Sequence, residues 1–184
     1  VDTTFRTIAD RDHRWLLGRS MGGHGAIRLI MRHPEVFGAA SIDAGFMAMV
    51  EGMVPDLMIV TLASETPGPP YEFAPTNGWN SEQLFSICAA YTPNMTNPPW
   101  YVDFLLREDG TVDEDVEERL LAQSPPALVH AFDGSDYPVD LFLRIGDNDQ
   151  FGDTFWPVID ALEAEGMSFE LRTFHGDHWT PSLT

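Results

Sequence analysis

The residues with the clearest chemical potential lie near the start of the chain, where a serine stands among glycines in Gly18-Arg19-Ser20-Met21-Gly22. This G-x-S-x-G pattern is typical of a sharp strand-to-helix turn, which holds the serine hydroxyl clear of a sheet in a strained backbone conformation. We expect the residues two before and two after Ser20 to collide unless both lack a side chain. A carbonyl substrate on Ser20 would accept a hydrogen bond from the N–H of Met21, at the positive end of the following helix.

A serine nucleophile requires a general base, and the base requires an acid that orients it. After a nucleophile turn of this kind, the acid and then the histidine follow in chain order, each just beyond a later strand. Asp149 follows the apolar segment 139–145, and His178 lies in the loop after segment 169–174. The order of these segments therefore predicts a nucleophile, an acid and a base drawn from distant parts of the chain.

Neighbouring residues offer alternatives for the acid and the base. Asp147 precedes Asp149 in the same turn, where aspartate also serves as a turn former. Asp43 follows an earlier predicted strand and is otherwise a solvated carboxylate or a strand-end cap. His175 lies nearer the last predicted strand than His178 does, so spacing alone leaves both histidines open.

The sequence predicts no metal site and no cofactor. The grouping of His175, Asp177 and His178 has no third convincing ligand nearby. Segment 147–152 begins like a calcium loop, but Phe151 stands where an oxygen ligand is needed. A single cysteine, Cys88, excludes an internal disulfide framework and a cysteine-based zinc site, and we expect it to be a small core residue.

Hydrophobic spacing places these residues on alternating strands and helices. We expect strands at 15–18, 36–42, 139–145 and 169–174, helices at 21–32, 81–89, 113–123 and 153–165, and the tail of a helix at 1–9. The first strand lacks polar alternation, so we expect it to be buried on both faces. The alternation predicts an α/β fold, with a mostly parallel sheet and helices on both of its faces.

The middle of the chain, residues 46–123, is rich in proline, glycine and aromatic residues. We interpret it as a cap-like insertion over the end of the sheet, within a single domain of residues 1–184. A group of methionines at 47, 49, 53 and 58 predicts either core packing or, beside the serine, an adaptable acyl pocket.

Composition and net charge disfavour several classes of binding partner for this chain. The chain has 184 residues with 43% hydrophobic residues, which excludes wholesale disorder. Its 10 Lys and Arg residues against 29 Asp and Glu give a net charge of −19, which disfavours nucleic acid and anionic membrane surfaces. No apolar run approaches the ~18 residues of a membrane span, and residues 1–6 lack the apolar region of a signal peptide. We expect no membrane partner, and the cytoplasm is slightly favoured.

Residues 10–26 resemble the nucleophile region of the esterase D-like family of serine α/β-hydrolases. That group includes S-formylglutathione hydrolases, feruloyl and acetyl xylan esterases, enterochelin esterases and mycolyltransferases. The similarity continues in His33-Pro34-Glu35-Val36-Phe37-Gly38, Ser124-Pro125, the Gly146-to-Asp149 turn and Gly176-Asp177-His178-Trp179, and is vague from 46 to 123. It implies an α/β-hydrolase fold with Ser20 as nucleophile, Asp149 as acid and His178 as base.

The resemblance implies hydrolysis of carboxylic esters through an acyl-serine intermediate. Small neutral esters fit the acidic composition and the apolar middle segment. Arg19, His24 and Trp179 are candidate pocket residues. An acyltransferase of the same fold, and a non-catalytic remnant that acts as an interaction subunit, are the alternatives.

Members of that family have several strands before the nucleophile strand, and a loop there that supplies a second oxyanion donor. Against that pattern we expect a reduced sheet and an oxyanion hole short of one donor, which is worth about 3–4 kcal/mol. We also expect an unpaired apolar edge at the strand of residues 15–18. Such edges pair or aggregate, so the sequence predicts a homodimer or higher oligomer that covers this edge.

Overall fold

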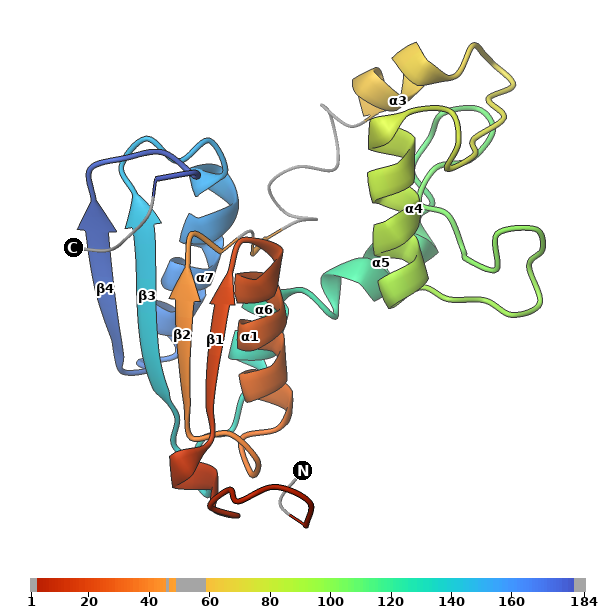
Figure 1. Ribbon diagram of the computed structural model, residues 1–184. Coiled ribbons are helices and arrows are strands. Elements are labelled where there is room, and N and C mark those ends of the chain that lie inside the picture. The colour runs from red at the N-terminus through yellow and green to blue at the C-terminus, as the bar shows by residue number, and fades with distance from the viewer. Residues whose placement is uncertain (1–2, 46, 49–58, 181–184) are drawn as a thin grey trace. The chain divides into compact units, whose positions relative to one another are not determined.

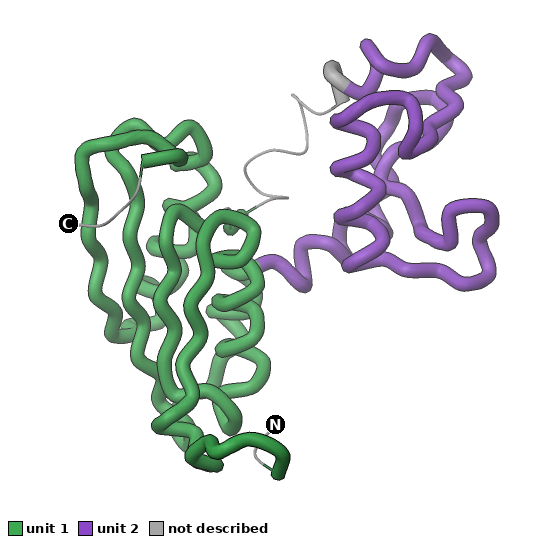
Figure 2. The backbone as a smooth tube through the Cα atoms, viewed as in Figure 1, with its two compact units in different colours: residues 1–48, 125–184 green, residues 49–124 purple. Residues whose placement is uncertain are grey.

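The chain divides into two compact units, each with its own hydrophobic core. The computed structural model describes residues 3–45, 47–48 and 59–180 (Figure 1). The first unit comprises residues 1–48 and 125–184, and the second comprises residues 49–124 (Figure 2). All the predicted nucleophile, acid and base residues belong to the first unit.

A four-stranded parallel sheet organises the first unit. Its strands are β1 (Trp15–Arg19), β2 (Ala39–Asp43), β3 (Asp140–Gly146) and β4 (Phe169–Phe174), in the order β1-β2-β3-β4. One row of the register runs Gly18, Ile42, Leu143 and Leu171 across all the strands. Because the strands are parallel, their carboxyl ends share one edge, which is where such sheets hold their ligands.

Helices follow or precede the strands, and the hydrophobic spacing predicts all of them except the short helix at 125–130. They are α1 (Met21–Arg32), α6 (Pro125–His130) and α7 (Gly152–Ala164), and a short 3₁₀ helix, η1 (Arg11–His13), leads into β1. Apolar residues at helical spacing on α1 and α7 meet those of β2 and β3. The largest fully buried members of this core are Ile27, Ile30, Ile42, Met47, Leu143, Ile145, Phe155 and Leu162.

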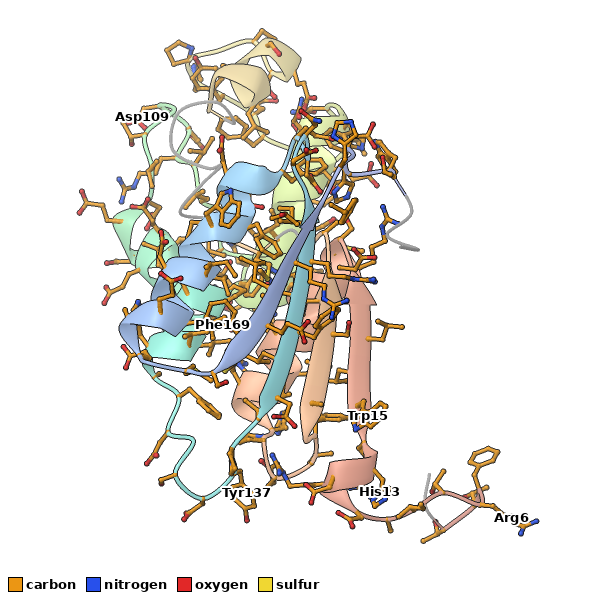
Figure 3. All side chains as sticks on the ribbon, turned by 90° about the vertical axis from the view of Figure 1, so that its left-hand side faces the viewer. Arg6, His13, Trp15, Asp109, Tyr137 and Phe169 are labelled. Carbon is orange, nitrogen blue, oxygen red and sulfur yellow. The ribbon has the colours of Figure 1, made fainter. Side chains whose placement is uncertain are left out.

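The helices α1, α6 and α7 cover the same face of the sheet (Figure 1). Parallel strands are joined by right-handed crossovers, and a strand order that advances in one direction sends every crossover to one side. Leu17 is therefore 80% exposed and Trp15, marked at the start of β1 in Figure 3, is 76% exposed. The predictions that β1 is buried on both faces and that helices flank both faces are wrong for the described part of this unit. The homodimer remains a prediction.

The second unit contains α3 (Ile59–Glu65), α4 (Trp79–Tyr91) and α5 (Glu114–Leu121). Asp113 caps α5 by accepting a hydrogen bond from the N–H of Val116 at 3.3 Å. Cys88 lies in this unit's core, as expected of a small core residue, and burial raises the pKa of its thiol to about 11. The single-domain assignment, with 46–123 as a cap, remains a prediction.

Element bounds follow the hydrophobic pattern closely where the pattern is strong. The bounds of α1 and β4 agree with prediction, whereas β2 begins at Ala39, later than expected. Residues 3–9 form turns and irregular structure instead of the expected helix tail. Met47 is buried, and the methionines at 49, 53 and 58 lie outside the described residues. Within the described part of the chain, every helix is too short or too polar to cross a bilayer.

Candidate active site

Ser20 occupies the turn that joins β1 to α1. Its backbone has φ 53° and ψ −123°, a region that costs a residue with a side chain about 1–3 kcal/mol and that is concentrated at functional sites. The Ser20 N–H donates to the carbonyl oxygen of Asp43 at 3.0 Å, which fixes the turn against the end of β2. The strained serine therefore projects at the carboxyl edge of the sheet.

Close backbone approach explains two of the glycines around this turn. A Cβ on Gly18 would lie 2.0 Å from the carbonyl oxygen of Gly22, so only glycine fits there. A Cβ on Gly22 would meet nothing within 4 Å, so the prediction that Gly22 also needs glycine is wrong. The crowding is at the backbone of Gly22 and not at its side-chain position. Gly23 is the second tight position, because its Cβ would lie 2.9 Å from the Cα of Gly45.

The His178 imidazole lies between Ser20 and Asp149. Its Nε2 is 2.9 Å from Ser20 Oγ, and its Nδ1 is 3.1 and 3.0 Å from the two carboxylate oxygens of Asp149. An ionised carboxylate only accepts, so Nδ1 carries the proton and Nε2 is left to accept from the Ser20 hydroxyl. The side chains of His178 and Asp149 are 2% and 1% exposed. The proximity expected from the order of the strands is present.

Short-range contacts hold Asp149 and the His178 ring in place. One Asp149 oxygen also accepts the N–H of Phe151 at 2.9 Å, so the acid is fixed within its own turn. The ring of Phe151 meets the His178 ring edge-on at 4.6 Å between centroids, and Trp179 meets it similarly at 5.2 Å. The imidazole thus contacts two aromatic rings. The sequence analysis did not assign Phe151 to the site. The signal that could have found it is Asp149 itself, because an aspartate in a turn often accepts the backbone N–H of the residue two positions later.

The loop that carries His178 crosses the end of β3. A Cβ on Gly146 would lie 2.3 Å from the carbonyl oxygen of Gly176, so the last residue of β3 must lack a side chain for the loop to pass. The N–H of Asn148 donates to the same Gly176 oxygen at 3.0 Å. These contacts bring a loop that begins at an edge strand back toward the nucleophile turn.

The alternative acids and base lie elsewhere in the same region. Asp147 binds His175 at 3.0 Å and accepts the N–H of Gly176 at 3.0 Å. This mutual contact raises the pKa of His175 and lowers the pKa of Asp147. Asp43 ends β2 and forms an ion pair with Arg144 at 3.4 Å. Asp149 is thus the aspartate that contacts His178.

The remaining predicted residues take separate positions. His24 is buried on α1, with Nδ1 3.2 Å from the carbonyl oxygen of Met47. Met21 is the first residue of α1, so its N–H has no acceptor one turn earlier in the helix. Trp179 is largely exposed beyond its contact with His178, and the Arg19 guanidinium donates to the carbonyl oxygen of His178.

The metal grouping considered from the sequence is engaged in other contacts. His175 is bound to Asp147, and His178 uses both ring nitrogens on Asp149 and Ser20. One oxygen of Asp177 accepts the backbone N–H groups of Trp179 and Thr180 at 3.0 and 2.9 Å. These side chains thus take part in contacts within the loop and with Ser20.

The chain resembles several solved structures of esterases and hydrolases that are about twice its length. A ferulic acid esterase is 20% identical over 96% of this chain and 49% of its own, with a TM-score of 0.53. The S-formylglutathione hydrolase FrmB from Staphylococcus aureus is 16% identical over 97% and 49%, with a TM-score of 0.52. FphF, a fluorophosphonate-binding serine hydrolase of Staphylococcus aureus, is 16% identical over 97% and 52%, with a TM-score of 0.53.

The chain thus spans about half the length of these neighbours, and the likeness establishes an α/β-hydrolase fold. None of the curated proteins matches the sequence. The protein family described as "Putative esterase" matches residues 1–172, a span that contains Ser20 and Asp149 and ends before His178. The chain belongs to this esterase family.

Proposed function

We propose that the chain carries the active site of a serine esterase, which hydrolyses carboxylic esters through an acyl-serine intermediate. The observation that carries the proposal is the continuous line of contacts from Asp149 through His178 to Ser20, with Nε2 2.9 Å from Oγ. Membership of the esterase family supports the same reaction class. The strained backbone of Ser20 is a further support, because nucleophile turns store strain of this kind.

In the proposed reaction, Ser20 Oγ attacks the carbonyl carbon of the ester while His178 Nε2 takes the hydroxyl proton. The carbonyl oxygen becomes an oxyanion, to which the Met21 N–H donates at the start of α1. The Nε2 proton then passes to the alkoxy oxygen as the C–O bond breaks, and the alcohol leaves an acyl-serine. Water repeats the sequence and releases the acid. Asp149 fixes the imidazole tautomer and stabilises its charged form throughout.

We propose small neutral esters as the substrate class. The excess of 29 Asp and Glu over 10 Lys and Arg gives the chain a negative field, which disfavours anionic esters in the approach to the site. Neutral esters are therefore the first substrates to test, and the series begins with short acyl chains.

Hydrolysis of p-nitrophenyl acetate and butyrate tests the proposal. We expect turnover that an active-site-directed phosphonate abolishes, and a loss of at least about 10⁴-fold in kcat for Ser20→Ala. Ser41→Ala, at the middle of β2, is the matched control and should keep wild-type turnover. Ester product formed from an added alcohol would instead identify an acyltransferase. A folded wild-type chain that neither turns over nor reacts with the phosphonate would identify a non-catalytic member.

A further inference from the structure

Arg19, the residue before Ser20, connects the nucleophile turn to the loop that carries His178. Its guanidinium Nη2 donates to the carbonyl oxygen of His178, and Thr180 O lies 3.5 Å from the same nitrogen. These two carbonyls belong to residues on either side of Trp179. The side chain at the end of β1 thus reaches the loop after β4, although β1 and β4 lie at opposite ends of the strand order.

The rest of the His178 loop is held from the β3 side. Gly176 contacts the end of β3 through the N–H of Asn148 and the Asp147 carboxylate. Beyond Gly176, Asp177 organises a local turn by accepting the N–H groups of Trp179 and Thr180. Those contacts shape the loop, but they do not join it to the turn that holds Ser20. The Arg19 guanidinium does, at the carbonyl of the very residue whose ring must face Ser20 Oγ.

We propose that Arg19 is a positioning residue, which sets the distance between His178 Nε2 and Ser20 Oγ by fixing the His178 backbone to the nucleophile turn. This inference rests on the proposed esterase function. Arginine suits the task because its planar guanidinium presents several donors and stays charged at every working pH. Because Arg19 and Ser20 are adjacent, a displacement of the turn moves both residues together. The hydrogen bond from Arg19 then carries the His178 backbone with Ser20 and keeps the distance from Ser20 Oγ to His178 Nε2.

The proposal predicts a loss in kcat and not in substrate affinity. A misplacement of about 1 Å in a catalytic group costs on the order of 10²-fold in rate. Arg19→Met keeps an unbranched apolar stem and removes every donor, and we expect kcat to fall about 10- to 100-fold while KM changes less than about threefold. Arg19→Lys restores one cationic donor and should recover part of the loss.

Steady-state hydrolysis of p-nitrophenyl butyrate and the kinetics of phosphonate labelling provide the measurement. For Arg19→Met we expect slower labelling that still reaches one adduct per chain, which separates a displaced base from a misfolded site. Arg172→Gln, an exposed arginine of β4 that binds Glu170, is the control and should retain wild-type kcat. A kcat for Arg19→Met within twofold of wild type would overturn the proposal.

If circular dichroism shows that Arg19→Met is unfolded, a comparison of Arg19→Lys with Arg19→Gln tests the same proposal. A higher kcat for the lysine variant supports the positioning role of Arg19, and equal kcat values overturn it. These outcomes are distinct from failure of the esterase proposal, in which wild type and the Arg172→Gln control would also lack turnover and labelling.

Discussion

Two aspartate–histidine pairs lie on the same two loops, and they differ in the exposure of their side chains and in their neighbours. Asp149 and His178 are 1% and 2% exposed in their side chains, whereas Asp147 and His175 are 49% and 90% exposed. Both pairs have a closest contact of 3.0 Å. The buried histidine has Ser20 at its second ring nitrogen and contacts two aromatic rings. The exposed pair instead anchors the loop through Gly176.

A short aspartate–histidine contact does not by itself identify a catalytic pair. Water screens the charges of an exposed pair, so the pair contributes little to the stability of the fold. A buried pair keeps one tautomer, and its charged form on protonation is stabilised by a nearby carboxylate that water does not screen. The nucleophile at Nε2 then decides the function. On this account the two pairs should respond very differently to the same substitutions.

The largest expected effect is at the histidines. His178→Ala removes the proposed base, and we expect kcat to fall by at least about 10⁴-fold. His175→Ala removes only an exposed loop contact and should leave kcat within about threefold of wild type. Steady-state ester hydrolysis at a fixed pH measures both. Equal losses in the two variants would break the distinction between the pairs.

The aspartates should show the same contrast at a smaller scale. Asp149→Asn preserves shape but removes the charge that fixes the His178 tautomer, and a loss of about 10³- to 10⁴-fold in kcat is expected. Asp147→Asn keeps the turn and should cost less than about threefold. If Asp147→Asn were the more damaging of the two, Asp147 would be the orienting acid and the assignment here would be reversed.

Gly146 tests how the loop reaches its position. In Gly146→Ala the new Cβ would lie 2.3 Å from the Gly176 carbonyl oxygen, which forces the His178 loop away from β3. We expect kcat to fall on the order of 10²-fold, together with a lower Tm. Gly152→Ala is the control, because its Cβ has only Trp156 Nε1 nearby, at 3.9 Å. Wild-type turnover in Gly146→Ala would show that the loop is not held by this crossing.

The smallest effect is a pH-dependent stability from the exposed pair. The pKa of His175 is raised above 6.5, so its contribution is present below that value and is lost as the pH rises through the folded pKa. The pKa of Asp147 is lowered from 3.8, so its contribution is present above that value and is lost in stronger acid. Wild type should therefore exceed His175→Gln slightly in Tm near about pH 5.5 and match it near about pH 8.5. A Tm advantage that grows with pH would contradict this sign.

The features of the fold and the site that depend on local sequence pattern could be predicted from the sequence. The apolar spacing of residues 21–32 and 169–174 predicts α1 and β4 with the observed bounds. The order of strand ends predicts that an acid and a histidine from these two loops approach Ser20, and the family resemblance selects Asp149 and His178 among the candidates. Such features are encoded within a few neighbouring residues or in chain order, which the one-dimensional pattern retains.

The features that sequence reasoning missed depend on packing between distant segments. An apolar run such as Trp15-Leu16-Leu17 reads as buried on both faces, because its pattern does not say that α1, α6 and α7 all pack on one side. Phe151 contacts the His178 ring, and Arg19 donates to the His178 carbonyl oxygen. Both contacts join residues that are far apart in the chain. Their side-chain types alone do not reveal these partners.

The site of covalent labelling by a fluorophosphonate probe tests whether Ser20 is the nucleophile. Trypsin cleaves after Arg19 and Arg28, and in the peptide 20–28 that results, Ser20 is the only residue with a side-chain hydroxyl. We expect one adduct per chain on this peptide, formed much more slowly in His178→Ala. An adduct on another peptide, or a folded wild-type chain that stays unlabelled, would contradict it.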